Sequence, residues 1–224
     1  MKLFTSINIS PRMLFGFDET WLTQLAKQFI RTGDVVYDIG AHIGYTALVF
    51  SKLVGEKGKV HAFELLPSVA SNYLQKTLIA NQIKNTKVHA IGIADTQTDI
   101  DIFVGNTMMG TLTKGGYESG IIEKCQIDTL DNYIKSNNIP PPNLIKIDVE
   151  RAEIACLTGA LETIKKFNPI LIIEFHNKEL LRLGYKVLTE LGYRLQTKTD
   201  VVNEDYLSKI TSFYGNILAQ KIDK

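Results

Sequence analysis

The sequence predicts an α/β fold with a mostly parallel sheet, and three observations lead to that class. Short apolar runs rich in β-branched residues recur along the 224-residue chain, and most precede a segment with helical spacing. The first half reads strand, helix, strand, helix, strand, an order that implies parallel strands joined by right-handed crossovers. Acidic residues stand where predicted strands end, which is the edge at which such sheets bind ligands.

The N-terminal half contains three predicted parallel strands. Residues 1–18 are expected to form a loop or a lid, and apolar spacing predicts a helix over 19–31. The predicted strands start at Val35 and span 59–63 and 87–91, and the helices between them are 47–54 and 69–80.

After residue 98 the pattern changes. Residues 99–104 alternate polar and apolar like a half-exposed strand, and 121–127 is expected to return and pair with it. Between them, 105–120 is rich in glycine and threonine and is predicted to be a flexible substrate loop. The remaining predicted elements are helices 130–135, 151–166 and 178–191, strands 143–149, 170–173, 193–197 and 215–219, and an ordered loop at 198–212. We expect all 224 residues to form one domain.

Composition narrows the function classes. Hydrophobic residues make up 45% of the chain and charged residues 22%, with a formal net charge of +1. This balance does not favour a broad surface for nucleic acid or anionic membranes. No apolar run reaches the roughly 20 residues needed to span a bilayer, and the N-terminus lacks a signal-peptide pattern. Cys125 and Cys156 lack metal-ligand spacing, so a cytoplasmic enzyme fits these features.

A glycine motif follows the first strand. Asp38, Gly40 and Gly44 have the spacing D-x-G-x-x-x-G, which differs from the G-x-G-x-x-G of dinucleotide binders. Glycines allow close approach of a ligand, and the helix start offers unpaired N–H groups. Asp38 would repel a phosphate but attract an ammonium group, which favours S-adenosyl-L-methionine. The alternative is a glycine-rich turn of any α/β protein.

The ends of the second and third strands complete the predicted cofactor site. Glu64 suits a ribose, because one carboxylate can accept from both hydroxyls; NAD enzymes use the same contact, and a solvated acid before a turn is the alternative. Leu65, Ala90 and Ile91 are predicted to line an adenine pocket, from their position at strand ends alone.

The strand at 143–149 carries unusual charges. Lys146, Asp148 and Glu150 alternate with apolar residues, although a central parallel strand is normally apolar on both faces. Buried charges need partners or a function. Lys146 and Asp148 could simply form ion pairs, and Glu150 and Glu153 could simply favour a helix N-terminus.

The end of the strand at 170–173 supplies a candidate general base. Glu174 and His176 point the same way, and His176 would lie beside Asp148 if the two strands are neighbours. We predict His176 as the base, supported by Asp148 and Glu174, with Lys146 holding the carboxylates. The rival interpretation is a metal ion bound by Asp148 and Glu174.

Several blocks of the sequence resemble the FkbM family of methyltransferases over roughly residues 30–195. They are Asp38 to Tyr45, Phe63-Glu64, Asp128 to Asp131, Ile145 to Glu153 and Ile173 to His176, of which the block around Lys146 to Glu153 is the most specific. The resemblance implies a class I, Rossmann-like methyltransferase fold, with a seven-stranded sheet, a final antiparallel strand and helices on both faces.

It also implies methyl transfer from S-adenosyl-L-methionine, usually to a hydroxyl of a sugar or natural product. Two residues depart from the family pattern: His42 stands where Asn is usual and is expected to affect cofactor contacts, and Arg151 stands where Gly is usual and bears on the geometry after Glu150.

Other functions remain open at this point. A methyltransferase acting on nucleic acid or protein is one alternative, and the near-zero net charge counts against nucleic acid. A degenerate interaction module is another, and the intact Asp38, Gly40, Gly44, Glu64 and Asp148 count against it. A dehydrogenase is a weaker option because the glycine spacing is wrong. The sequence does not indicate an oligomeric state.

Overall fold

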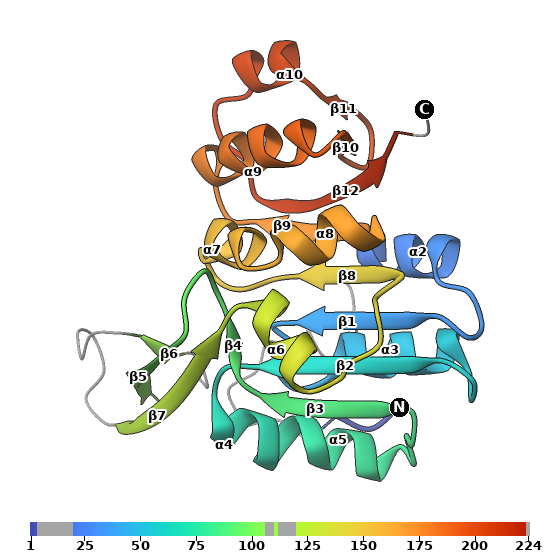
Figure 1. Ribbon diagram of the computed structural model, residues 1–224, viewed down its shortest axis with the longest axis vertical. Coiled ribbons are helices and arrows are strands. Elements are labelled where there is room, and N and C mark those ends of the chain that lie inside the picture. Colours follow the sequence, from blue (N-terminus) through green and yellow to red (C-terminus); the bar gives the residue numbers. More distant parts are fainter. Residues whose placement is uncertain (4–19, 106–109, 112–119, 223–224) are drawn as a thin grey trace.

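The computed structural model describes residues 1–3, 20–105, 110–111 and 120–222. Its centre is an eight-stranded sheet with the spatial order β11-β10-β12-β9-β8-β1-β2-β3 (Figure 1). The strands are β1 (Val35–Ile39), β2 (Lys59–Glu64), β3 (Thr86–Ala90), β8 (Leu144–Ile147), β9 (Ile170–Phe175), β10 (Tyr193–Gln196), β11 (Val201–Val202) and β12 (Gly215–Lys221).

The topology of this sheet confirms the predicted fold class. β3, β2, β1, β8 and β9 are parallel neighbours, whereas β12 runs antiparallel to both β9 and β10. The seven expected strands are present with the late antiparallel strand, and β11 adds a two-residue strand at the edge. The carboxyl ends of β1, β2, β8 and β9 therefore meet along one side, where the predicted site lies.

Helices cover both faces of the sheet (Figure 1). Apolar residues of α6 (Leu130–Ser136), α7 (Glu153–Thr158), α8 (Leu161–Phe167) and α9 (Lys178–Glu190) pack with Tyr37, Ile145 and Ile173 on one face. α2 (Thr20–Phe29) and α3 (Tyr45–Val54) pack with Val36, Leu144 and Ile172 on the other. Because side chains alternate along a strand, successive residues face opposite sides of the sheet and enter different cores.

A smaller sheet lies beyond the carboxyl ends of the parallel strands (Figure 1). It has the order β4-β7-β5-β6, with β4 (Gly92–Ile93), β5 (Thr98–Gly105), β6 (Gly110–Thr111) and β7 (Gly120–Asp128). β5 and β7 are antiparallel, which confirms the predicted pairing of 99–104 with 121–127. The predicted loops 1–18 and 105–120 fall largely outside the described residues.

The single helix predicted over 151–166 is wrong. Two helices, α7 and α8, occupy this stretch, and Gly159 separates them. A Cβ at Gly159 would overlap the carbonyl oxygen of Ala94, so the chain here passes directly against the loop after β4. The apolar spacing in the sequence continues through Gly159, so only this tertiary contact reveals that the helix is interrupted.

Two further segments differ from the expectation. The helix predicted at 69–80 starts at Pro67 and runs through α4 (Pro67–Val69), a π-helical turn (Ala70–Leu74) and α5 (Gln75–Ala80). The loop predicted at 198–212 contains β11 and a helix, α10 (Glu204–Lys209), whose first turn is capped by the Asn203 side chain. Among the described residues, no helix has the length and apolar character to cross a membrane.

Candidate active site

The glycine turn joins β1 to α3. Gly40 has φ +77° and Gly44 has φ +90°, a region that favours glycine. A Cβ at Gly40 would overlap the backbone carbonyl oxygen of Asp148, and one at Gly44 would meet the side chain of Leu74 at 2.6 Å. The turn is therefore packed against the end of β8 and against the helix after β2. From the sequence alone, we predict that these glycines allow the close approach of a ligand.

Asp38 is buried beneath this turn. Its side chain is 0% exposed; Thr46 Oγ1 donates to its Oδ2 at 2.6 Å, and Lys146 Nζ lies 3.4 Å from its Oδ1. Burial raises the pKa of Asp38, while Lys146 and Thr46 oppose that shift. The predicted attraction between Asp38 and an ammonium group would thus act from below the surface.

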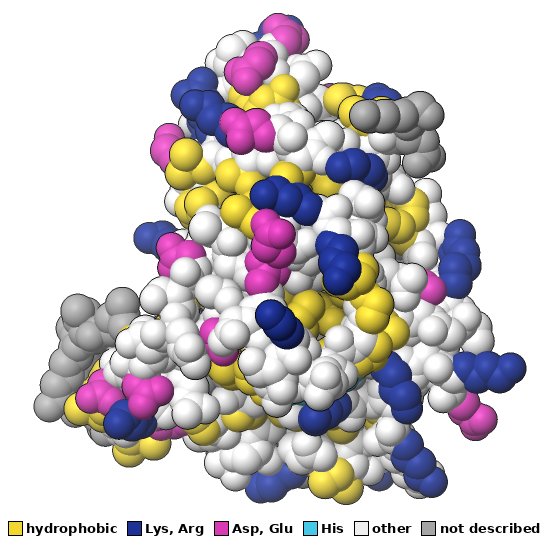
Figure 2. All heavy atoms as spheres, in the orientation of Figure 1, with side chains coloured by type: hydrophobic (Ala, Val, Ile, Leu, Met, Phe, Trp, Pro, Cys, Tyr) yellow, Lys and Arg dark blue, Asp and Glu magenta, His cyan; other side chains and the backbone are white. Residues whose placement is uncertain are grey.

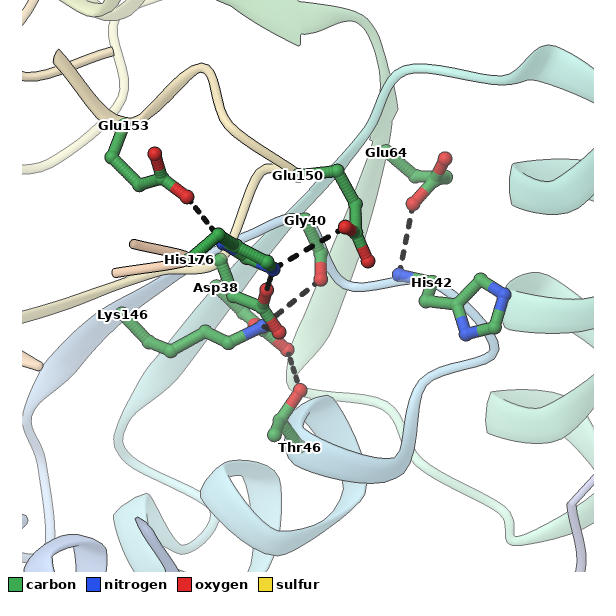
Figure 3. Close-up of polar contacts among 10 residues, drawn as sticks. Asp38, Gly40, His42, Thr46, Glu64, Lys146, Glu150, Glu153 and His176 are labelled. Carbon is green, nitrogen blue, oxygen red and sulfur yellow. Dashed lines mark hydrogen bonds and ion pairs between the residues drawn. The ribbon is translucent and has the colours of Figure 1, made fainter. Parts of the chain in front are cut away.

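Lys146 joins the residues at the end of β1 to those at the end of β8 (Figure 3). It lies directly opposite Asp38 in the register of β1 and β8. Its Nζ donates to the Gly40 carbonyl oxygen at 2.9 Å and lies 3.3 Å from Asp148 Oδ2. The side chain is only 4% exposed, so its charge is balanced by buried neighbours rather than by water. This is the arrangement expected of a residue that holds carboxylates in place.

Glu64 is the last residue of β2, and its side chain holds the glycine turn through hydrogen bonds. One oxygen accepts from the backbone N–H of His42 at 2.9 Å, and the other accepts from Leu66 at 3.0 Å. Burial raises the pKa of Glu64, and these two bonds oppose the shift. Each carboxylate oxygen can accept a second hydrogen bond, so Glu64 can still accept from the two hydroxyls of a ribose.

His42 has φ +47° and turns its ring away from the acidic residues (Figure 3). Its Nε2 is buried and has no hydrogen-bond partner among the described residues. Burial first, and then the charge of Lys146, lowers the pKa of His42. An orphaned polar atom beside the glycine turn suits contact with a ligand that the chain alone does not supply.

The three residues predicted for adenine lie in different surroundings. Ala90 is exposed, and half-buried Leu65 packs in a small cluster with Leu66. Ile91 is buried in the main core and lines a hollow of about 340 Å³ beside Tyr133. Leu65 does contact the residue after Ile91, since a Cβ at Gly92 would meet its Cδ1 at 2.6 Å. The adenine pocket therefore stays a prediction.

The ends of β8 and β9 bring Asp148, Glu174 and His176 together. One side-chain ligand atom from each lies within 4.8 Å of the others. His176 Nε2 lies 3.9 Å from Asp148 Oδ1 and 3.3 Å from Glu150 Oε2. β8 and β9 are parallel neighbours, which is the condition on which the predicted closeness of His176 and Asp148 depended.

The partner on the other side of His176 is Glu153, which the sequence interpretation missed. Glu153 begins α7 and is fully buried, and its Oε1 is hydrogen-bonded to His176 Nδ1 (Figure 3). Where Nδ1 donates to this carboxylate, Nε2 is the ring nitrogen that faces Asp148 and Glu150. An acid in the first turn of a helix is common, so only the burial of Glu153 distinguishes it.

Glu174 is a half-buried acid that lies close to a second acid, Asp148. Burial, and then the negative charge of Asp148, raises the pKa of Glu174 to about 7. Asp148 lies close by, since one side-chain oxygen of each acid belongs to the group of ligand atoms within 4.8 Å of one another. The raised pKa of Glu174 is that of a half-buried acid whose charge is disfavoured beside a second carboxylate.

The backbone after β8 is strained. Glu150 has φ +31° and Arg151 has φ +72°, a region that side chains with a Cβ rarely adopt. Arg151 is the position where the FkbM resemblance has glycine. Two consecutive left-handed residues without glycine are costly, and such strain gathers at functional sites.

Comparison with solved structures identifies the class of the fold. The chain superposes on the methyltransferase FkbM of Methylobacillus flagellatus with a TM-score of 0.56 and 18% identity, covering 84% of this chain and 43% of that one. It also superposes on Aeropyrum pernix fibrillarin bound to S-adenosyl-L-methionine, with a TM-score of 0.54 and 13% identity over 89% of this chain and 73% of that one. The fold is that of class I S-adenosyl-L-methionine-dependent methyltransferases.

Sequence comparison defines the family. Residues 38–195 match the FkbM methyltransferase domain, so the chain belongs to this family and is an S-adenosyl-L-methionine-dependent methyltransferase. It is also 25% identical over 173 residues to the hexuronic acid methyltransferase AglP of Haloferax volcanii. That alignment covers 77% of this chain and 67% of AglP.

Proposed function

We propose that this protein transfers a methyl group from S-adenosyl-L-methionine to a hydroxyl of a sugar or a related small molecule. The observation that carries the proposal is His176, held by Glu153 through Nδ1 with Nε2 facing Asp148 and Glu150. The similarity to a hexuronic acid methyltransferase supports a sugar acceptor. A near-neutral chain of net charge +1 supports a small molecule over nucleic acid, and basic and acidic side chains are interspersed on the face in Figure 2.

The residues around the glycine turn would hold the cofactor. Glu64 would accept from the ribose hydroxyls, and the turn from Asp38 through Gly40, His42 and Gly44 would carry the amino-acid end. Leu65, Ala90 and Ile91 are proposed for adenine. When bound, S-adenosyl-L-methionine supplies a methyl group already activated by its sulfonium, so the chain mainly has to align the acceptor oxygen with that carbon.

His176 would remove the proton from the acceptor hydroxyl. A neutral hydroxyl is a poor nucleophile and loses its proton as its bond to carbon forms, so a base within hydrogen-bond reach accelerates the step. The proton would go to Nε2, and the buried carboxylate of Glu153 would stabilise the resulting imidazolium through Nδ1. Lys146 would act as a positioning residue, since it contacts Asp38 and Asp148 from within the core.

A metal-assisted mechanism is the second candidate. Asp148, Glu174 and His176 offer two carboxylates and an imidazole with ligand atoms within 4.8 Å of one another. A divalent ion there would acidify the acceptor hydroxyl directly, and His176 would serve as a ligand rather than as a base.

One assay separates these mechanisms. The acceptor is first identified by incubating the protein with radiolabelled S-adenosyl-L-methionine and a metabolite extract. With that acceptor, we expect His176→Ala to lower turnover by roughly 10²–10⁴-fold while the affinity for S-adenosylhomocysteine, measured by calorimetry, is unchanged. EDTA should have no effect.

Two nearby acids provide a matched pair for this assay. Glu153→Gln should lower turnover, whereas Glu162→Gln, in the first turn of the neighbouring helix α8, should not. Activity abolished by EDTA and restored by Mg²⁺ would establish the metal mechanism. Absence of any binding to S-adenosylhomocysteine by the folded wild-type protein would refute the cofactor assignment.

A further inference from the structure

Tyr214 is an exposed aromatic residue beside the acids Asp148, Glu150 and Glu174. It is 70% exposed, the largest exposed fraction among the large hydrophobic residues that the structure describes. It directly precedes β12, and the first residue of that strand, Gly215, pairs with Phe175 of β9. Tyr214 therefore lies beside Glu174 and His176, which flank Phe175 in the sequence.

The ring of Tyr214 is fixed along one side. It meets the ring of His176 edge-on, with 5.3 Å between centroids and 84° between planes. Glu174 lies near its hydroxyl, and burial together with that neighbouring acid raises the pKa of Tyr214 to about 12. An oriented ring that stays exposed can pack against a ligand with little further loss of conformational freedom.

We propose that Tyr214 is the platform on which the ring of the acceptor stacks, and that this acceptor is a pyranose. A pyranose has a face of C–H groups that can lie on an aromatic ring and hydroxyls around its edge. Beside Tyr214, the carboxylate oxygens of Asp148, Glu150 and Glu174 can accept from several hydroxyls at once. A flat aromatic acceptor would also stack but would leave most of these acceptors without a donor.

This inference rests on the proposed methyl transfer and adds the residue that orients the acceptor. Stacking on Tyr214 would hold the pyranose over the edge of His176, so that one of its hydroxyls faces Nε2. Tyr214 touches the acceptor in this arrangement and takes no proton. Its loss should therefore weaken acceptor binding far more than cofactor binding.

Nuclear magnetic resonance of the full chain with ¹³C-labelled tyrosine tests the proposal. Comparison with Tyr214→Phe assigns the ring signal of Tyr214. The wild-type protein, saturated with S-adenosylhomocysteine, is titrated with the methyl glycosides of glucose, galactose and mannose and, separately, with phenol. At least one glycoside should shift the Tyr214 signal in a saturable way.

Variants then show what the ring contributes. Tyr214→Leu should weaken the binding of that glycoside about tenfold, whereas Tyr214→Phe should retain most of it. Tyr206→Leu, a half-buried tyrosine of α10, is the control and should bind as the wild type does. The affinity for S-adenosylhomocysteine should be the same in all three variants.

Three results would refute the proposal that the acceptor ring stacks on Tyr214. They are no shift with any glycoside, a shift with phenol alone, and unchanged glycoside affinity in Tyr214→Leu. In each case, retained binding of S-adenosylhomocysteine would leave the proposed methyltransferase function standing. Failure of the wild type to bind S-adenosylhomocysteine would instead refute the proposed function itself.

Discussion

The two sides of the candidate site are built differently. On the side proposed for the cofactor, at the ends of β1 and β2, Asp38 and Glu64 are buried and each is bonded by groups of the chain. On the side proposed for the acceptor, at the ends of β8 and β9, Asp148 lies close to Glu174 and helps to raise its pKa. In the first region two of the three left-handed positions, 40 and 44, are glycines and only His42 is not, whereas in the second both left-handed residues, Glu150 and Arg151, carry a Cβ.

This difference indicates distinct tasks. Carboxylates that are held by groups of the chain give a preformed surface, which suits a cofactor that is the same in every reaction cycle. Two acids that lie close together beside a histidine offer carboxylate oxygens that can accept hydrogen bonds from a ligand, which suits an acceptor with hydroxyl groups. Lys146 and Gly40 are where the two sides meet, so changes there should have the largest effects.

Among these substitutions, that of Lys146 should lower the free energy of unfolding the most. Lys146→Met leaves the fully buried Asp38 without its cation, which should lower the free energy of unfolding by about 3–5 kcal/mol. Lys165→Met is the control, because Lys165 forms an exposed pair with Glu162 and should cost no more than about 0.5 kcal/mol. Urea denaturation measures both. Equal losses would show that the two sides do not depend on Lys146.

Gly40→Ala should separate the glycine turn from the end of β8. Its φ of +77° disfavours a Cβ, and the new atom would also overlap the carbonyl oxygen of Asp148. We expect a loss of about 3 kcal/mol. Gly33→Ala, with φ +97° and open space around the Cβ, should cost only the backbone term of about 1–2 kcal/mol. The difference in melting behaviour isolates the clash, and a smaller loss for Gly40→Ala would contradict it.

The pH dependence of stability tests the crowding on the acceptor side. Folding raises the pKa of Glu174 from its ordinary value of 4.5 to about 7. Its stabilising contribution is therefore complete below about pH 4.5 and is lost as the pH rises through about 7. Glu174→Gln should match the wild type near pH 4.5 and exceed it by about 1–2 kcal/mol above pH 7, a range reduced for partial exposure.

Denaturation series at several pH values, with EDTA present to exclude bound metal, measure this difference. A difference that is constant with pH, or one that favours the wild type at high pH, would contradict the raised pKa of Glu174.

Arg151→Gly should give the smallest effect. Glycine relieves the left-handed strain at φ +72° but gains entropy in the unfolded chain, so we expect a net stabilisation of about 0.5 kcal/mol. Arg182→Gly, in the middle of α9, should instead destabilise by about 1 kcal/mol. Thermal denaturation compares the two variants, and destabilisation by both would mean that the backbone at Arg151 carries no strain.

The order of strands and helices follows from sequence patterns that act over short distances. The apolar runs before Asp38, Glu64 and Asp148 form adjacent parallel strands, because burial on both faces selects β-branched apolar residues. Local pattern failed at Gly159, where the predicted helix breaks. The reason is a close approach to Ala94, a residue far away in the sequence.

The sequence by itself also determined the chemistry of the site: acids at successive strand ends, a glycine turn and one histidine at the end of β9. Only the tertiary structure decided the partners. Asp38 and Lys146 are 108 residues apart and meet through the register of β1 and β8, and His176 finds Glu153 through the packing of α7 on β9. Ion pairs of this kind depend on which face of a strand or helix is buried against which neighbour, and no local propensity encodes that choice.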